Sequence, residues 1–387
     1  MTILFYISVF LVIYAYVGYP LVLWVTAKIK PRHVRKGHIC PAVSVIIAAR
    51  NESDKIRQKI EHTLGLIYPK ERLSVLVASD ASDDGTDEIV QEYATRGVTL
   101  VRAPRRGGKE YAQGLAVAAA KGEILVFTDA ATILEPDTLS RLVQNFSDPT
   151  IGAVSTEDLL VDSAGTPSGE GLYVKYEMWV RRLESCFHSL VGLSGSCFAI
   201  RRQLCANWSP NLASDFMGAL RAARQGHRSI ADPSVRGRFP AVISAQHEVR
   251  RKVRTFLRGI TVLMANLDML NPFRYGRFAF QLASHKLLRF LVPFFLLTIL
   301  ATTILLIAEQ PFRFLFWMQF GLYALGIIGA LLVPLQQNRV VRLASFFAMV
   351  QWAMLVAWTQ YLRGRRQVAW DPSRRPGRPA SDHAPTR

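Results

Sequence analysis

The chain has 387 residues, and at about 150 residues per domain this length suggests two or three structural units. Half of its residues are hydrophobic, and its formal charge of +18 would suit a nucleic-acid-binding protein or a protein at an anionic membrane surface. The sequence contains no DNA- or RNA-binding motif, and basic flanks of membrane-spanning segments explain the charge more simply. We therefore expect the membrane as a partner and no nucleic acid.

The chain begins with an apolar segment, Ile3 to Val25, that is long enough to cross a bilayer. This segment lacks the basic start and the small-residue cleavage site of a signal peptide, so we interpret residues 1–27 as a retained transmembrane anchor. Five basic residues follow closely, and the positive-inside rule then predicts that the next domain is cytoplasmic. They are Lys28, Lys30, Arg32, Arg35 and Lys36.

From residue 40 onward, short apolar runs alternate with helical patterns, which is typical of βαβ units. The apolar runs predict strands over Val43–Ala49, Ser74–Ala78, Val98–Arg102 and Glu123–Phe127. The segments between them predict a helix through Ile56, Ile60 and Leu64, a second over Thr86–Tyr93 and a third over Glu110–Ala120. Such an alternation favours a parallel sheet with right-handed crossovers.

Acidic residues follow two of these strands. Asp80 and Asp84 come after the second strand, and Asp129 comes after the fourth. Ligands of open α/β sheets bind beyond the carboxyl ends of the strands, so these carboxylates are placed to bind a divalent metal, a base or a ribose. Lys109, on the glycine-rich loop between them, supplies a cation for a phosphate. Each acidic turn alone is as well explained as a turn former, and the prediction depends on their joint placement.

The pattern changes after Pro149. Residues 152–155 predict a strand, a polar loop covers residues 162–169, and residues 172–188 predict a helix. A turn of small residues leads into another strand over residues 193–200, and Ser214 begins a helix that Gly226 ends. We assign residues 40–245 to this cytoplasmic domain.

The remaining residues are basic and then apolar. Residues 246–285 predict basic amphipathic helices, which suit a membrane surface and equally suit a solvated domain face. Residues 286–363 predict transmembrane helices, with spans near residues 290–308, 312–333 and 344–362. Residues 364–387 form a basic tail that we expect to be disordered. Three spans would put this tail outside, whereas Arg363, Arg365 and Arg366 favour the inside, so one predicted span can instead be re-entrant or interfacial.

A series of motifs in this chain resembles the family 2 inverting glycosyltransferases, in the membrane-bound branch that contains synthases of cellulose, hyaluronan and chitin. The motifs are Ser44-Val45-Ile46-Ile47 with Asn51-Glu52, Asp80 to Thr86, Gly108-Lys109, Asp129-Ala130, Gly195 to Arg202, Ser214-Asp215 and Arg251 to Arg254. The resemblance covers residues 43–259. It implies an α/β GT-A domain, a Rossmann-like nucleotide-sugar-binding fold, flanked by transmembrane helices.

The resemblance also implies roles for single residues. Asp215 would be the general base that deprotonates the acceptor hydroxyl, and Asp129 would coordinate Mg²⁺ or Mn²⁺ on the diphosphate. Asp80 would bond the uracil edge, with Glu52 near the base or ribose and Asp84 on the nucleotide or metal side. The whole substrate-binding set would be Glu52, Asp80, Asp84, Lys109, Gly195, Ser196, Arg251 and Arg254.

The chain departs from the family pattern at three positions. Ala131 replaces the second acidic residue of the Asp-x-Asp motif, which removes one carboxylate from the metal site. Ser214 replaces the acidic neighbour that usually precedes the base. Thr255 replaces the tryptophan of processive synthases, which favours transfer of a single sugar. Glu157-Asp158 resembles the base motif too, but it precedes the Gly195-Ser196 segment, and we therefore prefer Asp215.

The sequence thus predicts a multi-pass enzyme of the inner (plasma) membrane that transfers a sugar from a nucleotide-diphosphate sugar, with UDP as the expected nucleotide. The expected acceptor is lipid-linked or a polysaccharide, as in the biosynthesis of cell-surface glycans. A processive polysaccharide synthase and a non-catalytic scaffold of the same fold are the alternatives. A transporter is disfavoured because the spans carry few charges, and a dinucleotide oxidoreductase because Gly-x-Gly-x-x-Gly is missing after the first strand.

Overall fold

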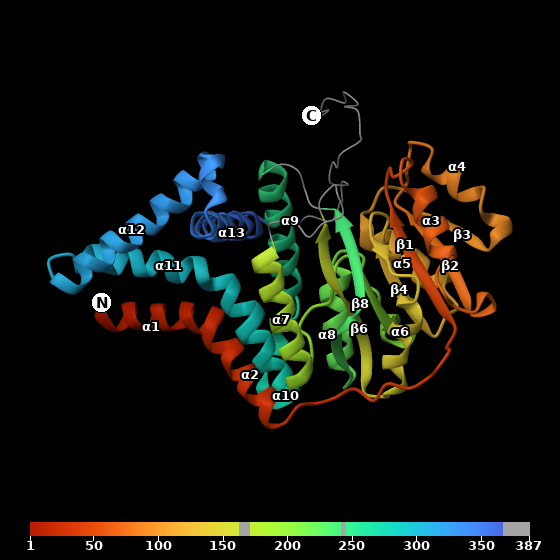
Figure 1. Ribbon diagram of the computed structural model, residues 1–387, viewed down its shortest axis with the longest axis horizontal. Helices are drawn as coiled ribbons and strands as arrows, with labels where there is room; N and C mark the ends of the chain where they lie inside the picture. The colour runs from red at the N-terminus through yellow and green to blue at the C-terminus, as the bar shows by residue number, and fades with distance from the viewer. Residues whose placement is uncertain (162–170, 241–244, 367–387) are drawn as a thin grey trace.

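The computed structural model describes residues 1–161, 171–240 and 245–366. Within these ranges an eight-stranded mixed sheet, in the order β3-β2-β1-β4-β7-β6-β8-β5, lies at the centre of one half of the molecule (Figure 1). Long helices from both ends of the chain form the other half, on the left in Figure 1. The chain therefore has a sheet domain and a helical domain, to which the N-terminal and C-terminal segments both contribute.

Four parallel strands make up one side of the sheet, and they confirm the strands expected from the sequence to within two residues at each end. They are β1 (Val43–Ala49), β2 (Leu73–Ser79), β3 (Val98–Arg102) and β4 (Ile124–Asp129). The register places Ala49 beside Ser79 and Ala48 beside Asp129. The carboxyl ends of β1, β2 and β4 therefore meet at one edge of the sheet.

Helices cover both faces of this sheet because successive side chains of a buried strand point to opposite sides. Val45 and Ile47 pack in one apolar cluster with α3 (Ile56–Leu64) and α6 (Thr138–Gln144). Ile46 packs in a second cluster with the alanines of α5 (Lys109–Ala119) and α8 (Ser214–Arg224). A shorter helix, α4 (Thr86–Gln91), follows β2.

The other half of the sheet is antiparallel where it joins β4. Here β7 (Cys197–Arg201) pairs antiparallel with both β4 and β6 (Ile151–Val161). The sheet is completed by β8 (Arg228–Pro240) and the short β5 (Ile133–Leu134). We did not expect β8 from the sequence, because it contains Pro233 and several arginines in place of an apolar alternation. The polar loop expected over residues 162–169 lies outside the described residues.

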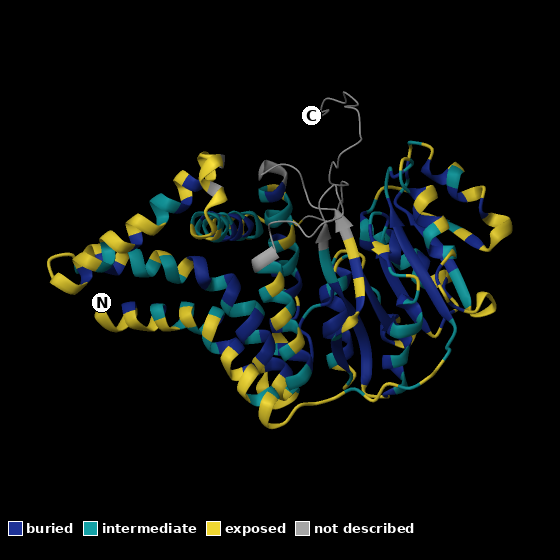
Figure 2. Ribbon diagram, viewed as in Figure 1, coloured by how far each residue is buried: buried dark blue, intermediate teal, exposed yellow. Residues whose placement is uncertain are grey.

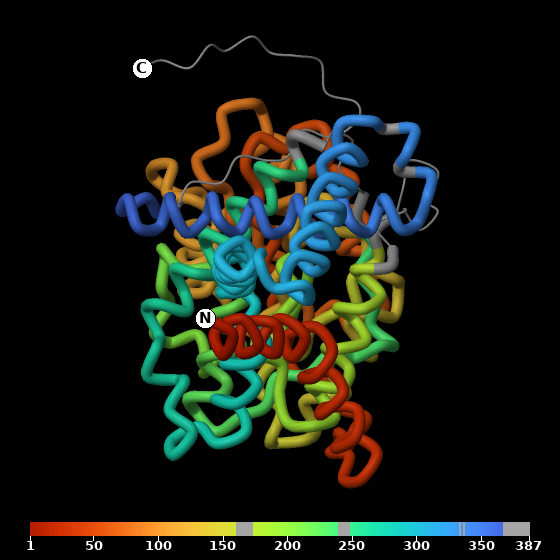
Figure 3. Tube along the Cα trace, turned by 90° about the vertical axis from the view of Figure 1, so that its left-hand side faces the viewer, coloured from red at the N-terminus to blue at the C-terminus, as the bar shows by residue number. Residues whose placement is uncertain are grey.

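Among the residues that the structure describes, four helical segments are long and apolar enough to cross a membrane. They cover Thr2–Ile29, Pro272–Leu305, Gln310–Leu331 and Arg339–Leu362. The second segment is one continuous path of α10 (Pro272–Leu282), a short π-helix η7 (Ala283–Leu287) and α11 (Leu288–Leu305), so it begins earlier than the expected span near residue 290. Figure 3 views the molecule from this side and shows α13 (Arg339–Leu362) lying across the other helices. The basic tail lies almost wholly outside the described residues.

Two helices join the sheet to this helical half. On α7 (Gly171–Phe187), Glu184 accepts a hydrogen bond of 2.6 Å from the Tyr19 hydroxyl of the N-terminal segment. The expected basic amphipathic helix is α9 (Ala245–Met264), followed by a short 3₁₀ turn, η6 (Leu267–Leu270). Its apolar side, with Leu257 and Ile260, packs in one cluster with residues of α8 and α13. Figure 2 shows most of the sheet as buried, with some exposed residues on β8, whereas α1 (Thr2–Ile13) and α12 (Gln310–Leu331) carry many exposed residues.

Candidate active site

A glycine loop is held against the end of β2 by Asp80. The Asp80 carboxylate is buried and accepts backbone hydrogen bonds from Gly107 at 2.7 Å and from Gly108 at 3.0 Å. Gly108 has a φ of 95°, which a residue with a side chain rarely adopts. A Cβ atom on Gly107 would lie 2.3 Å from the Tyr111 ring, so this loop requires glycine at both positions. Asp80 therefore fixes the loop that carries Lys109.

The loops after β1 and β2 are locked together in an unusual backbone conformation. Asn51 and Ala81 have φ angles of 52° and 53°, the left-handed region that non-glycine residues avoid. Asn51 and Asp83 exchange two hydrogen bonds, of 2.6 Å and 3.1 Å. Strained residues of this kind persist where the surrounding contacts hold them, and they concentrate at binding sites.

Asp84 and Glu52, both predicted site residues, lie in the same pair of loops. The Asp84 carboxylate accepts hydrogen bonds of 3.1 Å from the backbone N–H groups of Ser53 and Thr86. Burial alone would raise the pKa of Asp84, but hydrogen bonds from Thr86 and Ser53 outweigh it and lower the pKa. Glu52 is buried, and its backbone N–H donates to the Thr86 hydroxyl at 2.9 Å. The structure thus brings Asp80, Asp84 and Glu52 into one set of linked loops.

Lys109 and Asp129 form an ion pair at the end of β4. The Lys109 ammonium lies 2.5 Å from Oδ1 of Asp129 and donates to the backbone oxygen of Gly195 at 3.1 Å. Both side chains remain partly exposed, at 12% for Lys109 and 27% for Asp129. The charged groups are therefore accessible to a ligand at this edge.

Asp215 lies next to the same glycine. A Cβ atom built on Gly195 would lie 3.1 Å from Oδ2 of Asp215, so a side chain larger than hydrogen at this position would press on the carboxylate. Asp215 is in the first turn of α8, where the helix dipole favours its negative charge, and its Oδ1 accepts from the backbone N–H of Phe216 at 2.8 Å. The segment around Gly195 thus contacts Lys109, the partner of Asp129, and lies next to Asp215.

Ser196, the next predicted residue, bonds a carboxylate that we had considered only as a competing base. The hydroxyls of Ser194 and Ser196 donate to Oδ1 of Asp158 at 2.5 Å and 2.7 Å. Burial raises the pKa of Asp158, against the opposing effects of Arg181 and of these hydroxyls. Asp158 therefore holds the Gly195 segment in place, while the neighbouring Glu157 forms an ion pair with Arg182.

Arg251 and Arg254 lie on one face of α9, together with Arg258. The spacing of these positions, three and four residues, puts them on a common helical stripe. Arg251 makes two hydrogen bonds to Glu248, of 2.9 Å and 2.8 Å. Because β6 runs in the same direction as β4, the carboxyl edge lies at the top of Figure 1, where α9 also begins. Helix α9 thus begins at the same end of the molecule as the carboxyl edge.

Arg258 is a residue that the sequence analysis missed. Its guanidinium forms an ion pair with Glu110, the neighbour of Lys109, and the Glu110 side chain is almost fully buried. The same carboxylate oxygen lies 3.5 Å from the backbone nitrogen of Ser214. The spacing of Arg258 from Arg251 and Arg254 was a signal that could have found it, whereas its partner 148 residues away could not be read from the sequence.

Lys59 lies buried beneath the site. Its ammonium donates to the Thr128 hydroxyl at 3.0 Å and to the backbone oxygen of Thr132 at 2.6 Å. Burial lowers the pKa of Lys59 to about 8, and nearby Cys197 and Asp129 oppose this change in part. Lys59 is therefore a second cation, besides Lys109, that stabilises the carboxyl end of β4.

A metal ion would find one carboxylate ligand here. Among the residues that the structure describes, no three His, Cys, Asp or Glu side chains gather closely enough to hold an ion. Asp129 is followed by Ala130 and Ala131, and one of its oxygens is paired with Lys109. Mg²⁺ is commonly held by one or two carboxylates together with substrate phosphates and water. The residues therefore fit a metal that arrives with a diphosphate and is held at Asp129.

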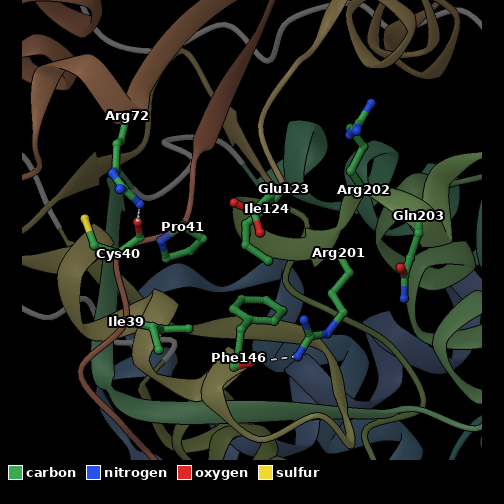
Figure 4. Close-up of a pocket in the computed structure, with 10 residues that line it drawn as sticks. All are labelled: Ile39, Cys40, Pro41, Arg72, Glu123, Ile124, Phe146, Arg201, Arg202 and Gln203. Atoms are coloured by element: carbon green, nitrogen blue, oxygen red, sulfur yellow. Dashed lines mark hydrogen bonds between the residues drawn. The ribbon is translucent and has the colours of Figure 1, made fainter.

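A cavity that we considered as an alternative site lies at the opposite edge of the sheet. It has a volume of about 560 Å³ and is lined by residues at the start of β4 and the end of β7, including Glu123 and Arg201 (Figure 4). Arg201 and Arg72 point into the surrounding backbone and donate to the carbonyl oxygens of Phe146 and Cys40. Because these arginines hold the local structure, we place the active site at the carboxyl edge.

Comparisons with known proteins show which sequences and folds the chain resembles. Residues 44–208 match the model of glycosyl transferase family 2. The beta-monoglucosyldiacylglycerol synthase of Trichormus variabilis is 26% identical over 198 residues, which cover 48% of this chain and 42% of that protein. The poly-beta-1,6-N-acetyl-D-glucosamine synthase of Staphylococcus aureus is 28% identical over 115 residues, or 29% of this chain and 27% of that protein. The chain thus matches less than half the length of these curated relatives.

A solved structure extends the similarity to almost the whole chain. A mannosyltransferase of Pyrobaculum calidifontis, determined with GDP-mannose and Mn²⁺, is 25% identical and superimposes with a TM-score of 0.71. The superposition covers 94% of this chain and 99% of that one. The expected GT-A domain flanked by long apolar helices is confirmed. Residues 44–208 are therefore a glycosyl transferase family 2 domain, built on the GT-A fold.

Proposed function

We propose that this protein is an inverting glycosyltransferase that moves a sugar from a nucleotide-diphosphate sugar to a lipid-linked or polysaccharide acceptor at a membrane. The observation that carries the proposal is that Gly195 lies next to both Lys109, the partner of Asp129, and the carboxylate of Asp215. Inversion needs a base on the acceptor side of the anomeric carbon and positive charge on the diphosphate side. Gly195 has such a cation and such a carboxylate as its neighbours.

In this proposal Asp215 takes the proton of the acceptor hydroxyl while that oxygen forms a bond to the anomeric carbon. The bond between the anomeric carbon and the diphosphate oxygen breaks, and the nucleoside diphosphate leaves with the electron pair. Lys109, Arg251 and Arg254 balance the negative charge of the leaving group. A divalent metal held by Asp129 would supply further charge stabilisation to the diphosphate when it is bound.

The linked loops after β1 and β2 are proposed to hold the nucleotide. Asp80 would accept from the base edge with the oxygen lone pairs that the glycine loop leaves available, and Glu52 and Asp84 would lie near the ribose. We propose UDP as the nucleotide. Gly195 and Ser196 would line the path between the donor sugar and the acceptor, with Asp158 holding both in place.

The helical half is proposed to lie in the membrane. Its four candidate spans expose large apolar side chains, such as Phe314 at 69% and Leu331 at 74%, which is costly in water. The basic residues that follow α2 (Tyr19–Ile29) favour a cytoplasmic catalytic domain by the positive-inside rule. We therefore propose a multi-pass protein of the inner membrane whose sheet domain faces the cytoplasm.

A single transfer is favoured over processive synthesis. Thr255, at the position of the tryptophan of processive synthases, is exposed and turns its hydroxyl to the Arg251 backbone oxygen at 2.9 Å. It therefore offers no aromatic surface on which a growing glycan could stack. A polymer synthase remains the second candidate, and the size of the product distinguishes the two.

The test uses the full chain in detergent or lipid nanodiscs with UDP- and GDP-linked sugars and a lipid extract as the acceptor source. Release of nucleoside diphosphate together with a labelled lipid or glycan product is the expected result, and the product linkage should have the opposite anomeric configuration to the donor. A ladder of products after long incubation would favour the polymer synthase. If no donor is consumed, and UDP and GDP do not bind in calorimetry, the proposed function is wrong.

A further inference from the structure

We propose that the Glu110–Arg258 ion pair is a positioning contact. It holds the donor side of the site, at Lys109, and the acceptor side, at Asp215, in fixed positions relative to helix α9, which leads to the membrane helices. This inference rests on the proposed function, in which Lys109 serves the donor and Asp215 serves the acceptor. Neither Glu110 nor Arg258 contacts the reacting atoms in this scheme. Their role is to hold three helices in one arrangement.

Glu110 contacts each of the three helices. It stands in the first turn of α5, directly after Lys109, and its carboxylate pairs with Arg258 of α9. The same oxygen lies 3.5 Å from the backbone nitrogen of Ser214, the residue before Asp215. Its backbone oxygen accepts a hydrogen bond of 2.7 Å from the Trp208 indole. Glu110, which follows Lys109, thus contacts Ser214, which precedes Asp215.

The charges around Arg258 fit this central position. Burial by itself lowers the pKa of Arg258, but Glu110 first and then Asp215 and Asp129 outweigh burial and raise the pKa. The guanidinium is therefore in the electrostatic field of both catalytic carboxylates as well as that of its direct partner. A buried carboxylate such as Glu110, left without its cation, would be strongly destabilised and would shift to find another partner.

The pair also connects the site to the helical half. Leu257 and Ile260, which flank Arg258 on α9, pack in one cluster with Phe216 of α8 and Met354 of α13. Arg251 and Arg254 lie on the same stripe of α9 as Arg258. A displacement of α9 against the membrane helices would therefore move Arg251 and Arg254, the proposed diphosphate ligands. It would also move the first turn of α5, which contains Lys109, and the first turn of α8, which contains Asp215.

The test is a double-mutant cycle with Glu110→Gln, Arg258→Gln and the double variant. Each single variant should lower kcat by about 10- to 100-fold, because small displacements of catalytic groups have effects of this size. The donor KM and the affinity for UDP should change less than kcat does, because Lys109, Arg251 and Arg254 are themselves retained. The double variant should be no slower than the worse single variant, since either change removes the same contact.

A matched control is the ion pair of Arg224 and Asp268, at 2.8 Å, which ties the other end of α8 to the turn after α9. Arg224→Gln and Asp268→Asn should leave kcat close to that of the wild-type enzyme. Additive losses in the cycle, a near-normal kcat in either Glu110→Gln or Arg258→Gln, or an equal loss in the control pair would overturn the proposal.

Hydrogen exchange provides a readout that does not depend on activity. Glu110→Gln should speed amide exchange in residues 108–112 and in residues 214–217, at both ends of the tie, and Asp268→Asn should not. Unchanged exchange in these two segments would also overturn the proposal. A wild-type chain that binds and transfers nothing would instead contradict the proposed function, and the exchange result would still decide whether the pair joins the two turns.

Discussion

The ammonium of Lys109 lies 2.5 Å from Oδ1 of Asp129, so the carboxylate proposed to hold a metal already has a protein cation as its partner. A divalent ion at Asp129 has to share this carboxylate with Lys109, and Ala131 offers no second oxygen ligand. The diphosphate of the donor would supply the additional ligands. Metal binding and nucleotide binding should therefore depend on each other in this protein.

Asp129→Ala should remove the metal-dependent part of UDP binding. Calorimetry with UDP in the presence and absence of Mn²⁺ measures this effect, and the wild-type enzyme should bind UDP more weakly after EDTA treatment. Ala131→Asp is the matched variant in the other direction, since it restores a second carboxylate and should tighten Mn²⁺-dependent binding. Wild-type activity that EDTA leaves unchanged would show that the metal role is wrong.

Asp215→Asn should abolish sugar transfer while leaving nucleotide binding largely intact, because the proposed base acts on the acceptor and not on the donor. Loss of a general base lowers the rate by about 10²- to 10⁴-fold. Initial rates of nucleoside diphosphate release and UDP calorimetry measure the two effects separately. Glu157→Gln is the control, because Glu157 pairs with Arg182 and should retain activity. A nearly normal rate in Asp215→Asn would exclude it as the base.

Arg254→Lys should strongly reduce activity while the protein stays in the membrane fraction. Lysine keeps the charge but loses the planar pair of donors that can bind two phosphate oxygens at once. If α9 only attracted anionic lipids, where each basic residue contributes about 1 kcal/mol, the exchange would change little. Arg250→Lys, at an exposed position of the same helix, is the control for a lipid role. The comparison needs rates and flotation assays for both variants, and an active Arg254→Lys enzyme would refute the donor-site role.

Lys59 should make the stability of the sheet domain rise with pH above about 8. Its pKa is about 8 in the folded protein and 10.5 in its ordinary state, so the unfolded chain binds the extra proton between these values. Stability therefore increases with pH through this window, by at most about 3 kcal/mol, and Lys59 contributes no slope below pH 8.

Thermal melting between pH 7.5 and pH 10 tests this effect. Lys59→Met should melt with a flatter pH dependence than the wild-type protein over this range. Lys121→Met removes an exposed lysine and should leave the wild-type slope unchanged. Equal slopes for Lys59→Met and the wild-type protein would mean that the Lys59 pKa is not lowered.

The sequence alone determined the parallel part of the sheet and the order of its motifs. The runs around β1, β2, β3 and β4 are short, buried and separated by helical patterns, and local composition is enough to identify such elements. Asp80 directly follows β2, and Asp129 is the last residue of β4, so both could be located from the predicted strand ends. The long apolar segments were equally visible, because membrane spans are recognised by length and hydropathy.

Only the tertiary structure decided which of these residues meet. Gly195 lies next to Asp215 and Lys109 because β7 pairs antiparallel with β4 and therefore begins at the carboxyl edge, where Cys197 lies beside Thr128. Local patterns contain no information about such a pairing between segments about 70 residues apart. For the same reason β8, with its proline and arginines, and the Glu110–Arg258 pair were missed: each depends on a partner that lies far away in the chain and close only after folding.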